Sequence, residues 1–256
     1  MKQGQKLWTR EELILAINLY CKLPFGKLDR NTSEVKHLAK MIGRTDSSVA
    51  FKLNNFASLD PSLQARGVKG AVNSSKLDKE IWNEFYNNWN IYSYKSEELL
   101  AQYEHTSVLQ LNKISEEDLP REGKDREQSV RIRVNQCFFR SSIMAAYNNT
   151  CCITGIKEKE FLIAGHIKKW SEDIGNRMNP RNGIAINALH DKLFEAGFMT
   201  ITPEYKIKIS PILLKEKSPV SQEYFKKYDQ QNIILPSRFL PDPEFLKFHN
   251  NERFKG

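Results

Sequence analysis

The sequence predicts an α+β protein in two parts: a helical N-terminal domain over residues 1–115 and a second domain over residues 116–256. Apolar residues recur at the spacing of amphipathic helices through the first part. Short apolar runs between turn residues, a pattern typical of strands, appear after residue 160. Between the parts lies a mixed-charge stretch with Pro120 and Gly123, which is typical of an exposed linker.

The composition favours an anionic partner. Lysine and arginine number 39 against 31 acidic residues, a net charge of +8, and such a balance attracts polyanions such as nucleic acid. No apolar run approaches the ~18 residues of a membrane helix. The N-terminus also lacks the apolar segment of a secretory signal. We therefore expect a cytoplasmic protein that does not contact a membrane.

The four cysteines indicate neither a disulfide framework nor a structural zinc site. A zinc site of this kind needs two Cys-x-x-Cys-like pairs, and only Cys151 and Cys152 are close in the sequence. Adjacent residues of a strand point to opposite faces. We expect Cys151 and Cys152 to be buried thiols in an extended strand.

The first predicted helix begins after Thr9. Glu12 stands three residues later, so the two residues form a capping box, and Pro24 ends the helix. Residues 76–104 predict a further helix with an aromatic stripe at Trp82, Phe85 and Trp89. A stripe at this spacing is more often core than a surface on which bases stack.

Residues 32–56 predict a helix-turn-helix-like segment. One helix begins at Ser33, Gly43 breaks it, and Thr45 caps a second helix. The solvent side of the second helix would offer groups that reach phosphates or base edges. The alternative is a plain helical hairpin with a polar outer face. The predicted DNA-binding residues here are Arg44, Ser47, Ser48 and Lys52, with Asn54 and Asn55 on the same side.

An amphipathic helix over residues 129–150 leads into the second domain, and its basic face carries Arg133 and Arg140. We predict that both arginines contact DNA. A strand over residues 161–164 then ends at His166, where the histidine would face a cleft. After a loop containing Asn182 and Gly183, the run 184–186 predicts a second strand.

The helix that follows begins at Asn187 and carries His190, Asp191 and Glu195. Asp191 and Glu195 are four residues apart, so they lie on one helix face. His190 and Asp191 are about 100° apart around the helix, so both need not reach one ion. Beyond it, residues 199–210 predict a β-hairpin, and the tail predicts a helix over 222–228 and a short helix after residue 243.

The stretch 151–197, with C-C-I-T-G, A-G-H-I-K-K-W and N-G-I-A-I-N-A-L-H-D-K-L-F-E-A-G, resembles the HNH endonuclease family and its ββα-metal fold. The resemblance implies that His166 is the general base that activates water. It implies that Asn182 braces the loop and aims this base. The third motif position falls on His190 and Asp191, where the family supplies a metal ligand, and Glu195 is a further ligand or a support.

The resemblance implies one divalent metal ion, Mg²⁺ or Mn²⁺, with Ni²⁺ or Zn²⁺ open if a histidine binds. In many relatives an Asp or His before the base also binds metal, but this chain has Gly165 there. Cations near the motif should contact the phosphates that flank the scissile bond. They are Lys168, Lys169, Arg177 and Arg181.

We therefore expect a metal-dependent endonuclease that acts on double-stranded DNA. The resemblance extends to a bacterial branch described as restriction endonucleases, so a role in restriction and defence is expected, and cleavage of modified DNA is a narrower version of it. Double-strand cutting by a one-site enzyme would suggest a homodimer. The competing hypotheses are a DNA-binding regulator with a degenerate HNH domain and an RNA nuclease. The deep, narrow major groove of RNA disfavours the latter.

Overall fold

The computed structural model describes residues 6–67 and 74–256. The chain forms two compact units, Met1–Ser142 and Ile143–Gly256. The sequence placed the division near residue 115, whereas the structure places residues 116–142 with the first unit. The reason is the long helix α8 (Lys124–Ala146), whose Phe138 ring packs 6.1 Å from that of Phe85 in the first unit. The assignment of DNA recognition to residues 1–115 stays a prediction.

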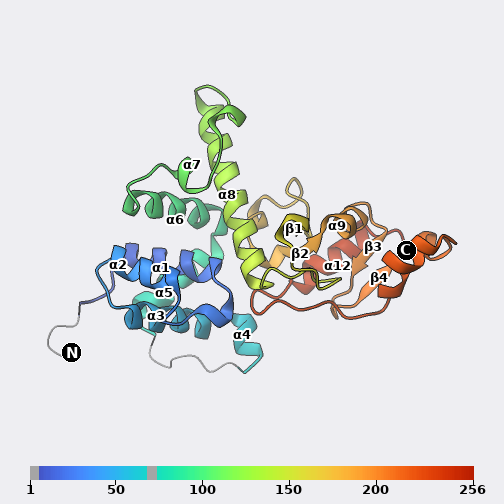
Figure 1. Ribbon diagram of the computed structural model, residues 1–256, viewed down its shortest axis with the longest axis horizontal. Coiled ribbons are helices and arrows are strands. Elements are labelled where there is room, and N and C mark those ends of the chain that lie inside the picture. The colour runs from blue at the N-terminus through green and yellow to red at the C-terminus, as the bar shows by residue number, and fades with distance from the viewer. Residues whose placement is uncertain (1–5, 68–73) are drawn as a thin grey trace. The chain divides into compact units, whose positions relative to one another are not determined.

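The first unit is helical, and α1 lies at its centre (Figure 1). The predicted capping box is present: the Thr9 hydroxyl accepts from the Glu12 backbone N–H, and the Glu12 carboxylate accepts from that of Thr9. The inner face of α1 packs against α3, α5 and α6. The helices are α1 (Arg10–Lys22), α2 (Ser33–Met41), α3 (Asp46–Leu59), α4 (Pro61–Ala65), α5 (Lys76–Asn87), α6 (Trp89–Tyr103), α7 (Val108–Leu111) and α8, with 3-10 turns at Phe25–Lys27 and Glu116–Asp118.

The helix pair α2 and α3 forms as predicted. Gly43 turns the chain between them with a φ of +66°, a conformation that glycine adopts without steric cost. Thr45 then caps α3 by accepting a hydrogen bond from the Ser48 N–H. In the first turn of α3, Ser47 is exposed and Ser48 is half-buried.

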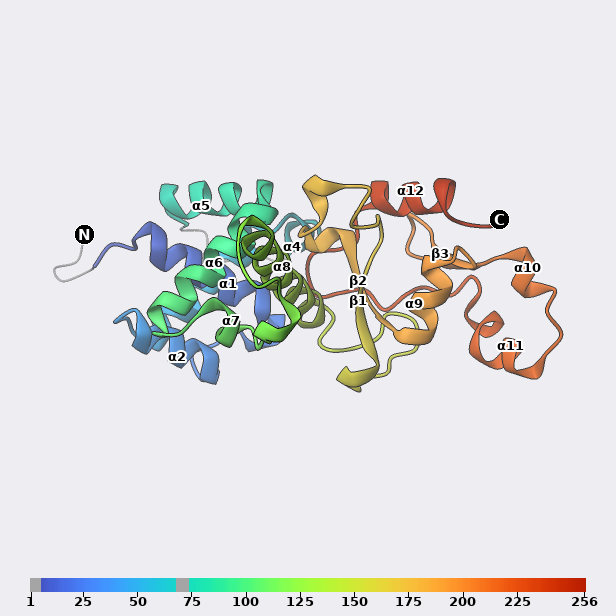
Figure 2. The ribbon, with the colours of Figure 1, turned by 90° about the horizontal axis from the view of Figure 1, so that it is seen from above.

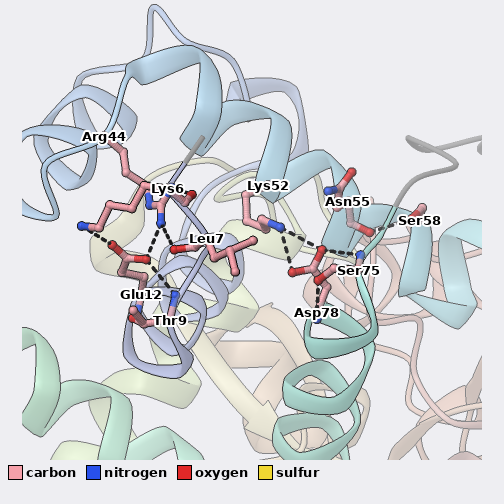
Figure 3. A network of polar contacts seen from close by, with 10 residues as sticks. All are labelled: Lys6, Leu7, Thr9, Glu12, Arg44, Lys52, Asn55, Ser58, Ser75 and Asp78. Carbon is pink, nitrogen blue, oxygen red and sulfur yellow. Dashed lines mark hydrogen bonds and ion pairs between the residues drawn. The ribbon is translucent and has the colours of Figure 1, made fainter. Parts of the chain in front are cut away.

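The expectation that Lys52 and Asn55 face solvent is wrong, and Arg44, which was predicted to contact DNA, is bound within the protein (Figure 3). Lys52 is buried and donates to both carboxylate oxygens of Asp78 on α5, at 2.7 and 2.8 Å. The guanidinium of Arg44 is bound to the Glu12 carboxylate at 2.6 Å, and Asn55 is 1% exposed. The physical reason is that Lys52 ties α3 to α5, and Arg44 ties the turn before α3 to α1.

The predicted helix over 76–104 is interrupted at Asn88. This residue leaves the helical region, with φ −137° and ψ 50°, so α5 ends and α6 begins beside it. The aromatic stripe is core, as predicted: Trp82, Phe85 and Trp89 are each at most 4% exposed.

The second unit is built on a two-stranded antiparallel sheet with α9 packed against it (Figure 2). The register pairs His166 with Gly183 and Leu162 with Asn187. The predicted strands, helix and hairpin all form. The elements are β1 (Leu162–His166), β2 (Gly183–Asn187), α9 (Ala188–Glu195), β3 (Met199–Ile201), β4 (Ile207–Ile209), α10 (Pro211–Leu214), α11 (Pro219–Tyr224) and α12 (Pro243–Glu252), with 3-10 turns at Lys159–Phe161, Ile174–Asn176, Pro180–Asn182 and Lys226–Tyr228.

Cys151 and Cys152 are free, fully buried thiols, as predicted, but they lie at a turn and not in a strand. The Cys151 sulfur accepts from the backbone N–H of Asn187 at 3.3 Å, which joins this turn to the end of β2. The sulfur thus helps to position the start of α9. None of the described helices combines the length and the apolar character that a bilayer crossing requires.

The buried pair of Lys52 and Asp78 gives a prediction about stability. Asp78→Ala leaves the Lys52 ammonium buried without its carboxylate, which should lower the free energy of unfolding by about 3–5 kcal/mol. Glu80→Ala on the same helix is the matched control, because Glu80 pairs with Arg10 at the surface and should cost below about 1 kcal/mol. Urea unfolding of both variants measures the difference, and equal small losses would contradict the assignment.

Candidate active site

A cleft of about 500 Å³ opens in the second unit between β1, the chain that follows it, α9 and α12. Of the predicted motif residues, His166, Asp191 and Glu195 line this cleft, whereas Asn182 and His190 do not. Its polar and charged members are His166, Lys169, Ser171, Asp191, Lys192, Glu195, His249 and Arg253.

His166 lies at the end of β1 and is half-buried. Its Nε2 is 2.9 Å from the carbonyl oxygen of Arg177, a distance at which Nε2–H donates. A neutral imidazole with its proton on Nε2 carries its lone pair on Nδ1. Burial lowers the pKa of His166 from its usual value, so the ring is neutral at pH 7. Trp170 meets the ring edge-on, with centroids 5.7 Å apart.

Asn182 is fully buried, and its side chain is hydrogen-bonded to the chain just beyond His166. Its side-chain oxygen accepts from the Lys168 N–H at 2.8 Å. Its amide nitrogen donates to the carbonyls of Lys168 and Asn176, at 3.1 and 3.2 Å. The backbone carbonyl of Asn182 accepts from Ile167. Because these bonds enclose the residues after His166, Asn182 holds the backbone that carries the imidazole.

Asp191 and Glu195 stand one turn apart on α9 and both line the cleft. Burial, and then the charge of Glu195, raise the pKa of Asp191 to about 6. A half-buried carboxylate beside a second carboxylate is an unfavourable arrangement of charge. A bound cation would relieve it.

Gly165 leaves room for the Asp191 carboxylate. A Cβ at this position would lie 2.6 Å from Asp191 Oδ1 and 3.3 Å from a methyl group of Ile186. Side chains do not approach so closely, so no larger residue fits while Asp191 holds this place. The Asp191 carboxylate thus occupies the space into which a side chain at position 165 would extend.

His190 points away from the cleft, and its expected role as a metal ligand is corrected by its surroundings. The ring is buried, with Nδ1 3.0 Å from the Asn187 side-chain oxygen and Nε2 2.9 Å from the Tyr224 carbonyl. Tyr228 packs edge-on against it, at 5.3 Å between centroids. His190 therefore joins α9 to the segment around α11, because it lies on a helix face different from that of Asp191.

The predicted phosphate contacts divide into two groups. Lys169 is exposed and lines the cleft. The other three make contacts within the protein: Lys168 pairs with Asp173 and lies 4.5 Å from the Phe248 ring centroid, Arg177 donates to the Trp170 carbonyl, and Arg181 pairs with Asp242. In the first unit, Arg133 and Arg140 are exposed and line a separate hollow of about 280 Å³.

Residues 151–202 match the model of the HNH endonuclease family. This stretch is an HNH endonuclease domain, and it holds β1, β2, α9 and β3 of the second unit. Such a domain points to nuclease activity, and HNH nucleases generally use a divalent metal. A comparison with curated proteins found no match to the chain.

Two residues of the cleft escaped the sequence reasoning: His249 and Arg253, on and directly after α12. They lie beyond the matched residues and about fifty positions after the motif. No local pattern connects them to it, because the packing of α12 against β3 brings them there.

The raised pKa of Asp191 gives a prediction about pH. Its folded pKa of about 6 exceeds the ordinary aspartate pKa of 3.8, so ionised Asp191 destabilises the fold. This cost is full above pH 6, shrinks as the pH falls, and vanishes below about pH 4. Asp191→Asn should therefore stabilise the metal-free protein at pH 7 by about 1–2 kcal/mol, after allowance for solvent screening, and by less at pH 5.

Thermal unfolding at pH 7 and pH 5 measures the effect. Glu158→Gln is the control, because Glu158 is an exposed carboxylate of the same unit and should change neither value. A loss of stability in Asp191→Asn at pH 7 would show that the carboxylate is not strained.

Proposed function

We propose that this protein is a metal-dependent HNH endonuclease that hydrolyses phosphodiester bonds in DNA. The observation that carries the proposal is the cleft in which His166, Asp191 and Glu195 meet inside the matched domain. Hydrolysis of a phosphodiester needs a base for water and positive charge for the phosphate oxygens. His166 would be the base, and Asp191 and Glu195 would hold the cation that supplies the positive charge.

His166 is the proposed general base. Its ring is held through Nε2 by the Arg177 carbonyl and lines the cleft, and burial lowers its pKa, which favours the neutral form that can accept a proton from the attacking water. Asn182 acts indirectly, since it contacts the backbone at Lys168. Lys169 at the cleft's edge would contact a flanking phosphate and position the strand.

Asp191 and Glu195 fit a hard divalent cation. Both offer carboxylate oxygens, which Mg²⁺ and Mn²⁺ prefer, and Mg²⁺ is often held by one or two carboxylates with waters. Within residues 6–67 and 74–256, no cluster of three or more His, Cys, Asp or Glu side chains forms a metal site. Asp191 and Glu195 would hold the ion together with waters, and the bound ion would stabilise negative charge on the phosphate oxygens and the leaving group.

The first unit would bind duplex DNA. Ser47 and Ser48 begin the second helix of the helix pair, and Arg133 and Arg140 present positive charge on α8. The net charge of +8 supports the same role. Restriction of foreign DNA is the cellular role we favour, with modified DNA as a narrower target and a homodimer for double-strand cutting. An enzyme with this role would meet its DNA substrate in the cytoplasm.

A DNA-binding regulator with an inactive HNH domain is the second candidate. Gly165 at the position of a usual ligand favours it. The Asp191 carboxylate beside Gly165, which could bind the metal in place of the usual ligand, argues against it. RNA cleavage is a further outcome of the test below.

Plasmid cleavage tests the proposal. Wild type should cut supercoiled DNA with Mg²⁺ or Mn²⁺ and not with EDTA, and His166→Ala should lower the rate by about 10²–10⁴-fold, because it removes the general base. His37→Ala removes an exposed histidine of the first unit and should cut like wild type. Unmodified plasmid, cytosine-modified plasmid and RNA serve as parallel substrates.

Cutting by His166→Ala at the wild-type rate would refute the assigned base. Absence of cutting by wild type with every metal and substrate, together with intact DNA binding, would establish the regulator instead.

Gly165→Ala tests the place of Asp191. The new Cβ would force the Asp191 carboxylate away, so Mn²⁺ affinity and cleavage should both fall by about tenfold or more. Gly175→Ala is the matched control, since its Cβ would have ordinary contact, 3.6 Å, with Asp173 Oδ1. Calorimetric Mn²⁺ titration compares them, and unchanged affinity in Gly165→Ala would contradict the geometry.

A further inference from the structure

The end of α12 brings an arginine into the cleft from outside the matched domain. Arg253 follows α12 directly and lines the cleft with His166, Asp191 and Glu195. We propose that Arg253 binds a phosphate of the substrate in this cleft, and that Glu172 holds its guanidinium until the phosphate arrives. The proposal rests on the proposed nuclease function and adds a substrate-binding residue to it.

His249 fixes the last turn of α12 against the domain. Its ring is 3% exposed and stacks on Phe194 of α9, at 3.7 Å between centroids. Nδ1 lies 2.8 Å from the Thr200 hydroxyl of β3, and Nε2 lies 3.1 Å from the Phe194 carbonyl. The Arg253 N–H then donates to the carbonyl of His249. Arg253 is therefore tied, through His249, to the helix that carries Asp191.

Gly197 provides a second attachment. It ends the turn after α9 with a φ of +77°, and a Cβ there would lie 2.1 Å from the Arg253 carbonyl oxygen. The Lys255 N–H donates to the Gly197 carbonyl at 2.9 Å. A backbone approach this close leaves little freedom to the Arg253 backbone. The guanidinium thus starts from a fixed point, on the wall of the same cleft as the carboxylates.

Only some of the hydrogen-bond donors of the Arg253 guanidinium have partners within the described part of the protein. It forms an ion pair with Glu172, whose carboxylate also accepts from the Lys169 N–H at 3.3 Å. Its Nε is buried and has no hydrogen-bond partner among the described residues. The side chain is 36% exposed. A guanidinium has five donors, so one carboxylate leaves others for a second anion.

The chemistry of the cleft favours a phosphate as that anion. Asp191 and Glu195 contribute negative charge, which repels DNA unless cations offset it. Lys192 also lines the cleft; it lies 3.7 Å from Glu195 and its side chain is 79% exposed. Arg253, Lys169 and Lys192 are the cations of the lining, and of the three only the guanidinium of Arg253 matches phosphate with two parallel hydrogen bonds. Glu172 competes for the same donors, so the ion pair and the phosphate should exchange.

The test uses the full chain, and substitutions of Arg253 and of Glu172 should change DNA binding in opposite directions. Arg253→Ala should lower kcat/KM for plasmid cleavage on the order of 100-fold, and Arg253→Lys, which keeps the charge without the fork, should lower it less. Glu172→Gln should tighten binding of a fluorescent double-stranded oligonucleotide in EDTA by about two- to fivefold. Lys247→Ala removes an exposed cation of α12 outside the cleft and is the matched control.

Thermal unfolding of every variant accompanies these measurements. Arg253→Ala that cuts and binds like Lys247→Ala would overturn the proposal. Equal losses of binding and of melting temperature in Arg253→Ala and Glu172→Gln would also overturn it, because they indicate a structural ion pair. If wild type cuts nothing but Arg253→Ala binds the oligonucleotide more weakly than Lys247→Ala, the nuclease function fails and the phosphate contact stands.

Discussion

The Asp191 carboxylate lies so close to Gly165 that no side chain fits between them, and the site depends on this approach. The approach requires α9 to pack on β1, which the register of β1 and β2 and the Asn187 cap at the start of α9 determine. It half-buries the carboxylate beside Glu195 and raises its pKa. It also sets Asp191 on the cleft that His166 lines.

The same packing explains why the site is unfavourable for stability but suited to metal. Two carboxylates on one helix face repel each other, and burial of Asp191 adds to this cost. Elsewhere in the chain, charges in comparable burial are paired, as Lys52 is with Asp78 and Arg44 with Glu12. Two neighbouring carboxylates in a cleft, one of them with a raised pKa, are typical of a functional site, where strain persists because a ligand offsets it.

Local patterns predicted much of the fold. The capping box at Thr9, the turn at Gly43, and the strand–loop–strand–helix order around His166 each depend on neighbours within a few residues. Long-range partners were beyond such patterns. The polar spacing of α3 suggested that Lys52 faces solvent, because nothing in the sequence connects it to Asp78. Likewise, the sequence left His190 and Asp191 as nearly equal candidates, because nothing in it connects the His190 ring to the Tyr224 carbonyl.

The match to the HNH family covers residues 151–202, but the cleft continues beyond them to α12. The central claim is that Asp191 and Glu195, and not His190, hold a divalent ion beside His166. Anomalous scattering from crystals grown with Mn²⁺ tests it most directly. The account predicts one strong peak against the carboxylates of Asp191 and Glu195. A peak at the His190 ring, or none in the cleft at saturating Mn²⁺, would contradict it.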